Sequence, residues 1–302
     1  MDVFLPRTGR IYLDFIFAGL PKLPVAGEEV FAKSLSLMVG GSYNAARALW
    51  RLGVDAHLAA DLGNDEFSAI ARRLWDEDGL PTTFRRELDR PCAAVTCAYS
   101  LAHDRALLSY VDPLPPPDAD PRLLDEHGVR CVLLSGLPDD DAFWPLLEHA
   151  RNRSIPIVLD CQHNDHRLDD PLIRRMTELV DVFMLNSREA CTLTQTSSVD
   201  GAIDVLAPHV RCLVVKRGED GAVLVRDGSR LEQTAPKVDV VDTTGAGDCF
   251  AAGFTFGVVR GMDDAAALAH AVAAGSIACT GPGGDAAPDL SALEEMLREL
   301  PR

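Results

Sequence analysis

The chain has 302 residues, and its 46 Asp and Glu outnumber its 29 Lys and Arg, so the formal charge at pH 7 is −17. This balance argues against a nucleic-acid partner, because phosphates would be repelled by an acidic surface. Small anions remain possible ligands, since backbone N–H groups at a helix N-terminus can bind them. No apolar run is long enough for a membrane span, and no basic and then apolar leader begins the chain. We therefore expect a cytoplasmic protein without a membrane partner.

The first third of the chain combines two amphipathic helices with strands that need no helical cover. The helices are predicted over residues 44–52 and 66–78, each followed by a glycine suited to a helix C-terminus. The strands are predicted over residues 10–17, 29–38, 93–100 and 106–111. They could form a small separate sheet. The proline-rich residues 114–117 are the best candidate for a linker to the rest of the chain.

From about residue 128 onward, short apolar runs alternate with amphipathic segments. Strands are predicted over residues 131–134, 155–160, 182–185 and 212–216, with helices over 142–153 and 200–207. Continuous Val, Ile and Leu runs are typical of strands buried on both faces, and strand–helix alternation predicts a largely parallel sheet covered by helices. A short β-type run, 238–241, and an apolar helix, 249–261, follow.

The eight cysteines are scattered and contain no C-x-x-C pair, so they are interpreted as small buried hydrophobic residues. The one suggestive cluster is Cys161, His163 and His166 at the end of a predicted strand. Three possible ligands in one loop, without a second ligand pair at zinc spacing, favour loop residues over a metal site.

The strongest chemical signal is D-T-T-G-A-G-D, residues 242–248, at the start of the apolar helix. Gly245, Ala246 and Gly247 would let N–H groups approach an anion closely. Asp248 beside that anion hole makes sense as a general base that takes a proton from a hydroxyl during phosphoryl transfer. The alternative is a glycine-containing helix start in which Asp248 only complements the helix dipole.

Six elements in order resemble the ribokinase-like carbohydrate kinases, the PfkB family. They are Asp14 with Gly27-Glu28; Gly40-Gly41 with Asn44; L-G-N-D at 62–65 with Phe67; Asn186-Ser187-Arg188-Glu189; Lys216-Arg217-Gly218 with Gly221; and 242–248. The resemblance implies a three-layer α/β/α fold with a mostly parallel central sheet and a small β lid. It also implies a single domain over residues 1–302, with lid segments within 10–39 and 92–112. The implied activity is transfer of the ATP γ-phosphoryl group to a primary hydroxyl of a sugar or sugar-like molecule.

The resemblance also assigns roles on the nucleotide side. Asp248 would be the catalytic base, with Gly245, Ala246 and Gly247 as the anion hole. Asn186 and Glu189 would organise Mg²⁺ and phosphate, often through water. Lys216, Gly218 and Gly221 would lie close to the nucleotide. For Glu189 the alternative is an ordinary first-turn helix acid, and for Lys216 a solvated strand end.

A monovalent cation site and an acceptor site follow from the same resemblance. Asp242 and Thr244, with carbonyls of residues 280–284, would help to hold K⁺. Asp14, Gly40, Gly41 and Asn44 would bind sugar hydroxyls, since carboxylates and amides suit a polyol. The alternatives are a helix N-cap for Asn44 and an exposed strand end for Asp14.

Two loops depart from the family pattern. Gly41 precedes Asn44 by three residues where the family usually has four, so either Val39 replaces the first glycine or the loop is one residue shorter. In both cases the sugar loop is reshaped. After the strand 155–160 the family often shows D-x-N with an Arg soon after, whereas Asp160 here is followed by Cys161, Gln162 and His163, with Arg167 displaced. Gln162 and His163 could touch substrate, but the simpler interpretation is loop filler.

Other functions and an assembly remain open at this point. A nucleoside kinase of the same fold would need aromatic surface for a base, for which the candidates are Phe15, Phe17, Tyr43 and Tyr99, with Tyr43 foremost because it lies beside the sugar loop. A non-catalytic sugar or nucleotide sensor is less consistent with intact Asp248, Asn186 and Glu189. An exposed edge of the lid sheet would favour a homodimer.

Overall fold

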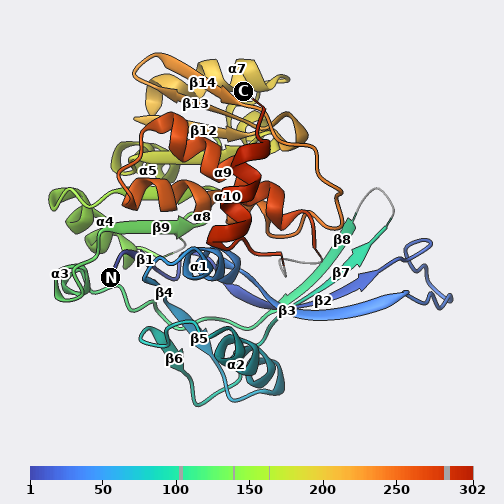
Figure 1. Cartoon of the computed structure of the whole chain (residues 1–302). Coiled ribbons are helices and arrows are strands. Elements are labelled where there is room, and N and C mark those ends of the chain that lie inside the picture. Colours follow the sequence, from blue (N-terminus) through green and yellow to red (C-terminus); the bar gives the residue numbers. More distant parts are fainter. Residues whose placement is uncertain (102–104, 139, 163, 282–285, 302) are drawn as a thin grey trace.

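The computed structural model describes residues 1–101, 105–138, 140–162, 164–281 and 286–301. An eight-stranded sheet forms its centre (Figure 1). In spatial order the strands are β14 (Ser229–Gln233), β13 (Ala222–Arg226), β12 (Cys212–Lys216), β11 (Val182–Asn186), β10 (Ile157–Asp160), β9 (Cys131–Ser135), β1 (Val3–Leu5) and β4 (Ala56–Leu58). The strands from β4 to β12 are parallel, whereas β13 and β14 join antiparallel at one edge. The mostly parallel central sheet is therefore confirmed.

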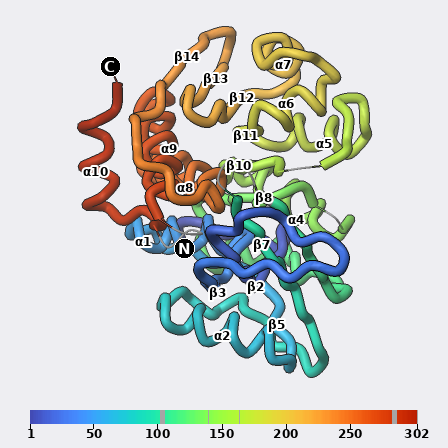
Figure 2. Tube along the Cα trace, turned by 90° about the vertical axis from the view of Figure 1, so that its right-hand side faces the viewer, coloured from blue at the N-terminus to red at the C-terminus, as the bar shows by residue number. Residues whose placement is uncertain are grey.

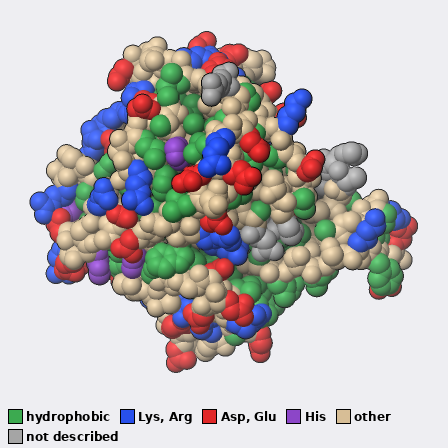
Figure 3. All heavy atoms as spheres, viewed as in Figure 1, with side chains coloured by type: hydrophobic (Ala, Val, Ile, Leu, Met, Phe, Trp, Pro, Cys, Tyr) green, Lys and Arg blue, Asp and Glu red, His purple; other side chains and the backbone are tan. Residues whose placement is uncertain are grey.

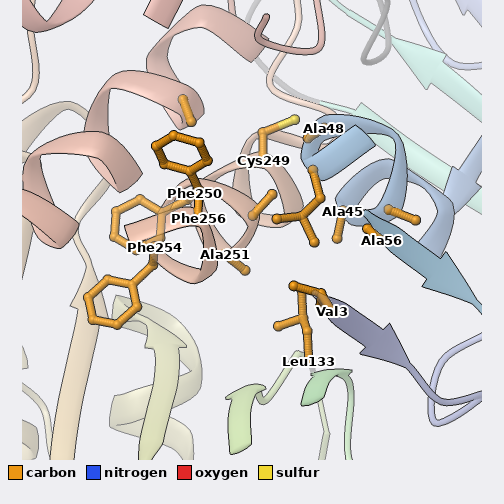
Figure 4. Packing of buried hydrophobic residues seen from close by; sticks show 14 of the residues in the cluster. Val3, Ala45, Ala48, Ala56, Leu133, Cys249, Phe250, Ala251, Phe254 and Phe256 are labelled. Atoms are coloured by element: carbon orange, nitrogen blue, oxygen red, sulfur yellow. The ribbon is translucent and has the colours of Figure 1, made fainter. Parts of the chain in front are cut away.

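Helices cover both faces of this sheet, which confirms the three-layer prediction (Figure 2). One face carries α1 (Ser42–Arg51), α8 (Ala246–Val259), α9 (Asp264–Ala278) and α10 (Leu290–Glu299). The other carries α3 (Arg122–Glu126), α4 (Phe143–Asn152), α5 (Pro171–Leu179), α6 (Ser187–Thr194) and α7 (Val199–Leu206). Strand side chains alternate between the two cores: Val3 packs with the first group, toward Ala45 and Ala251, and Phe4 with the second (Figure 4).

Small residues bring α8 close to α9. A Cβ on Gly253 would lie 2.6 Å from the His270 carbonyl oxygen, and one on Gly257 would lie 2.8 Å from Ala267 Cα. Glycine at both positions therefore permits the close approach of the two helices. This packing sets the place of the α8 N-terminus, where the 242–248 motif lies.

A separate sheet projects from the main body and is called the lid sheet (Figure 1). Its strands in spatial order are β3 (Ser34–Gly41), β2 (Ile11–Ala18), β7 (Ala94–Ser100) and β8 (Arg105–Val111). The prediction of a strand over 29–38 is wrong at both ends. β2 ends at Ala18, opposite Ser34, and the Lys33 N–H makes the last hydrogen bond to it, so residues 29–32 have no part of β2 opposite them, whereas pairing continues to Gly41. At its base the lid sheet packs near α2 (Glu66–Asp78), beside the short pair β5 (Ala60–Leu62) and β6 (Arg85–Glu87).

The proline-rich stretch after β8 is held in place by side chains. Proline-rich backbone makes no hydrogen bonds within itself, so its carbonyls need other donors. Arginine guanidinium groups supply them, over 2.7–3.0 Å: Arg10 to Asp112, Arg90 to Pro113, Arg7 to Pro115 and Arg86 to Pro116. The predicted linker is therefore a segment fixed by arginine hydrogen bonds, and it connects the lid sheet to the main body.

The predicted β-type run 238–241 is wrong, because these residues lie outside all three sheets of the described chain. Val240 is 62% exposed, and the Val241 N–H donates to the Cys279 carbonyl at the end of α9. Acidic and basic side chains are interspersed over the face seen in Figure 3. Within the part of the chain that the structure describes, no helix has the length and apolar character needed to cross a bilayer.

Candidate active site

The carboxyl ends of the central strands meet the N-terminus of α8. Asp160 ends β10, Asn186 ends β11 and Lys216 ends β12. Gly245, in the left-handed region with φ 77°, is the residue before α8, and Asp248 lies in the first turn. This is the edge at which open α/β sheets bind ligands.

Small residues at the α8 start let other site residues approach it. A Cβ on Gly245 would lie 3.1 Å from Asn44 Nδ2, and one on Gly247 would lie 3.3 Å from Lys216 Nζ. The Ala246 N–H donates a long hydrogen bond, 3.3 Å, to the Thr243 carbonyl. An anion held here would therefore share or replace that bond.

Asp248 receives one amide donor on each carboxylate oxygen. Asn44 Nδ2 donates to Oδ2 over 3.0 Å, and Gln162 Nε2 donates to Oδ1 over 3.3 Å. Burial, followed by the negative charge of Asp160, raises the pKa of Asp248 to about 6, although Asn44, Lys216 and Gln162 oppose the rise. A carboxyl with such a pKa is largely ionised at neutral pH and is a stronger base than an ordinary aspartate.

Asp160 and Lys216 form an ion pair beside this base. Lys216 Nζ lies 2.6 Å from Asp160 Oδ1, and the two side chains are 14% and 4% exposed. Burial alone would lower the pKa of Lys216, but the charge and hydrogen bond of Asp160 outweigh it and raise the pKa. The solvated strand end is therefore the wrong interpretation of Lys216. Asp160 was missed as a site residue, and its position at the end of a predicted strand was the available signal.

Asn44 and Asp14 are both buried, so neither the helix N-cap alternative for Asn44 nor the exposed strand end for Asp14 is correct. α1 begins at Ser42 after Gly41, so Asn44 lies inside the first turn, is buried and is not the N-cap. Asp14 is only 9% exposed, so it is not an exposed strand end. A Cβ on Gly40 would overlap Asp14 Oδ2, and one on Gly41, which has φ 68°, would overlap the Arg10 carbonyl. Both glycines are thus required by close approach.

Asn186 and Glu189 form a capping box at the start of α6. Asn186 Oδ1 accepts from the Glu189 N–H over 2.9 Å, and Glu189 Oε2 accepts from the Asn186 N–H over 2.8 Å. The first-turn alternative for Glu189 is therefore correct as a description of its geometry. The pair still lies beside Lys216, which is the register partner of Asn186.

The remaining predicted site residues lie in two turns. Gly218 and Gly221 have φ values of 63° and 86° between β12 and β13, and a Cβ on Gly221 would overlap the Gln233 carbonyl. Asp242 Oδ1 accepts from both the N–H and the hydroxyl of Thr244, over 3.0 and 2.8 Å. Of the predicted carbonyl donors at 280–284, positions 282–284 lie outside the described residues.

A cleft of about 1000 Å³ lies beside Asp248, whose partner Gln162 is among the residues that line it. Arg10, Tyr12 and Gly41 line it beside the lid sheet, Gln162 lines it next to Asp248, and Trp144 lines another part. Tyr12 was missed by the sequence reasoning, although the period of two in a strand places it on the same face as Asp14.

The prediction that Tyr43 is the foremost aromatic side chain for stacking on the base of a nucleoside is wrong. Tyr43 is 1% exposed, its hydroxyl donates to Asp78 Oδ2 over 2.8 Å, and its ring packs on Trp75. Phe15 and Phe17 alternate with Asp14 along β2 and so lie on the opposite face of the lid sheet. Tyr99, the register partner of Phe17, stacks on its ring.

The described side chains of the loop after β10 have partners other than a metal ion. Burial raises the pKa of Cys161 to about 12, and His166 Nδ1 lies 2.9 Å from Asp170 Oδ2. The residues that the structure describes contain no group of three His, Cys, Asp or Glu side chains that could hold a metal ion. His163 lies outside the described residues.

Comparison with known proteins agrees with this geometry. Residues 17–290 match the family described as pfkB family carbohydrate kinase. The chain belongs to the pfkB family. This carbohydrate kinase is 30% identical over 284 residues to the ATP-dependent ribose-1-phosphate kinase of Halopiger xanaduensis, covering 92% of this chain and 93% of the relative. It is 24% identical over 326 residues to a 5-dehydro-2-deoxygluconokinase of Geobacillus thermodenitrificans, covering 98% and 96%. The Arabidopsis thaliana ribokinase structure with ribose and ATP shares the fold, with a TM-score of 0.80, 22% identity and 98% coverage of each chain.

Proposed function

We propose that this kinase transfers the γ-phosphoryl group of ATP to a primary hydroxyl of a sugar, with Asp248 as the general base. The observation that carries the proposal is the half-buried Asp248 carboxylate, held by two amides in the first turn of α8, with a pKa of about 6. A base poised near neutral pH can accept the hydroxyl proton while the hydroxyl oxygen attacks phosphorus.

The residues around Asp248 supply positive potential for the phosphoryl group. N–H groups at the start of α8, over Gly245, Ala246 and Gly247, point toward an anion placed there. Lys216 keeps its charge through Asp160, and its Nζ lies next to the position of a Gly247 Cβ. Such fixed donors stabilise charge that develops during transfer.

The acceptor would lie between the lid sheet and α8. Asp14 and Asn44 offer a carboxylate and an amide to vicinal hydroxyls, beside the backbone of Gly40 and Gly41. A nucleoside acceptor is the second candidate, and Tyr12 in the cleft supports it, because its ring lies on the Asp14 face of the lid sheet.

The nucleotide would lie over the β12–β13 turn, near Lys216, Gly218 and Gly221. Gly218 suits a close approach, because a Cβ there would meet no atom within 4 Å. Asn186 and Glu189 fit a Mg²⁺ ion held through water rather than in a protein cage, since each already uses an oxygen in the capping box. Bound Mg²⁺ would neutralise phosphate charge. Asp242 and Thr244, as carboxylate and hydroxyl oxygens, are the side chains proposed for K⁺.

A homodimer through the lid sheet is proposed as well. Leu35 and Leu37 of β3 are 55% and 39% exposed, and Leu108 of β8 is 64% exposed. Register pairing through Phe15 and Cys97 places Leu37 and Leu108 on one face. Burial of such a face against a second copy would remove apolar surface from water. The net charge of −17 supports the absence of a nucleic-acid partner, and a cytoplasmic location is proposed.

The test is ADP release with a panel of free sugars and nucleosides, with and without Mg²⁺ and K⁺. We expect turnover on at least one sugar, loss without Mg²⁺, and a fall in kcat of about 10²- to 10⁴-fold for Asp248→Asn. Asp204→Asn, at an exposed position on α7, is the matched control. Near-wild-type turnover by Asp248→Asn would refute the assignment of the base. Ligand-induced stabilisation without turnover on any acceptor would favour a sensor.

A further inference from the structure

Gln162 reaches the catalytic carboxylate from the loop after β10. Its Nε2 lies 3.3 Å from Asp248 Oδ1, and its side chain lines the cleft. The two residues are 86 positions apart in the chain, so the contact depends on the fold. The interpretation of Gln162 as loop filler is therefore wrong.

The backbone at Cys161 and Gln162 is fixed in a conformation that directs the Gln162 side chain toward Asp248. Gln162 has φ 55°, a left-handed conformation that costs energy for a residue with a side chain and that concentrates at functional sites. Asn164 Nδ2 donates to the Gln162 carbonyl over 2.9 Å, and the Cys161 N–H donates to the Met184 carbonyl over 2.9 Å. A Cβ on Gly136 would lie 3.5 Å from Gln162 Oε1, so the amide oxygen lies over a glycine while the nitrogen faces Asp248.

We propose that Gln162 is a positioning residue for phosphoryl transfer, which fixes the Asp248 carboxylate together with Asn44. The proposal rests on the proposed function, in which Asp248 is the base. With Asn44 on Oδ2 and Gln162 on Oδ1, the carboxylate is held from two sides and cannot rotate without losing a hydrogen bond. Each oxygen keeps acceptor capacity for the hydroxyl of the acceptor.

Gln162 also favours the ionised form of Asp248. The charged groups that face Asp248 are Asp160 from β10, which disfavours ionisation, and Lys216 from β12, which favours it. Glu189 on α6 acts on Lys216. From α1 and the β10 loop come the neutral amides of Asn44 and Gln162. Loss of the Gln162 donor leaves burial and Asp160 less opposed, so the pKa of Asp248 should rise.

The test compares pH profiles of kcat for the wild type, Gln162→Leu and Gln162→Gly. Leucine removes the amide at similar size, and glycine removes it while relieving the left-handed strain. Both should lower kcat at pH 7 by about 10- to 100-fold, the range for losing a hydrogen bond to a charged group. Both should also move the acid limb to higher pH, with a smaller change in the acceptor KM. Gln162→Glu, which adds a carboxylate next to Asp248, should move the acid limb furthest.

Gln195→Leu is the matched control, because Gln195 also has a left-handed φ, 59°, but lies exposed at the end of α6. It should leave kcat and the pH profile unchanged. A rise in KM alone for the Gln162 variants would make Gln162 an acceptor ligand and overturn the proposal. An unchanged acid limb would also overturn it. If Asp248→Asn kept its activity, the proposed function itself would fail. If Asp248→Asn were inactive but the Gln162 variants had the kcat and pH profile of the wild type, only this inference would be refuted.

Discussion

Replacement of Asp248 by asparagine should make the protein more stable at pH 8, although it removes the proposed general base. Burial and Asp160 raise the pKa of Asp248 from its ordinary 3.8 to about 6. Since the folded protein binds this proton more tightly than the unfolded chain, the ionised carboxylate opposes folding. Stable but inactive variants of this kind are expected where a site is strained for function.

The size of the effect follows from the shift. The difference between about 6 and 3.8 is roughly 2 pKa units, and at 1.36 kcal/mol per unit the cost of the charge is about 3 kcal/mol. The new amide can accept from only one of its two donors, Asn44 and Gln162, so about 1 kcal/mol is lost with the other hydrogen bond. The net gain in the free energy of unfolding is about 2 kcal/mol at pH 8.

Urea unfolding of both proteins at pH 8 and near pH 4.5 measures this gain. As pH falls from 6 toward 4, wild-type Asp248 takes up its proton and its cost disappears, so the advantage of the variant should shrink over that window. Asp204→Asn should show no such pH-dependent difference. The argument from burial would be refuted if Asp248→Asn were less stable than the wild type at pH 8. It would also be refuted if the difference in the free energy of unfolding between the two proteins were the same at both pH values.

Two further predictions concern the lid sheet. Gly40→Ala should raise the KM for the acceptor at least about tenfold and the KM for ATP little. Its Cβ would displace the Asp14 carboxylate, and loss of one hydrogen bond to a charged group has that size. Asp204→Asn, at an exposed position on α7, is the control, and equal effects on both substrates would contradict the placement of Asp14. The double variant Leu35→Glu with Leu108→Glu should sediment as a monomer where the wild type sediments as a dimer. Val240 is 62% exposed and lies outside the lid sheet, so Val240→Glu should leave the dimer intact. A monomeric wild type would exclude the dimer.

Local sequence determined the elements and the placement of single residues on them. Buried apolar runs predicted the parallel strands, and the run of small residues before Asp248 placed it at a helix start, because these features depend on neighbours within a few positions. The error at 238–241 shows the limit of this reasoning, since a β-type run becomes a strand only where another strand lies beside it.

Only the tertiary structure decided which polar groups meet. The Asn44 contact with Asp248 spans 204 positions, the Gln162 contact 86, and the Lys216 contact with Asp160 spans 56. Tyr43 adjoins the sugar loop in sequence, but helical geometry turns its side chain into the core. Pairing between such groups depends on strand order and on the close packing of α8, neither of which a short stretch of sequence encodes. The place of Asp248 in the first turn of a helix was therefore readable from its motif, whereas the amides that donate to its carboxylate were not.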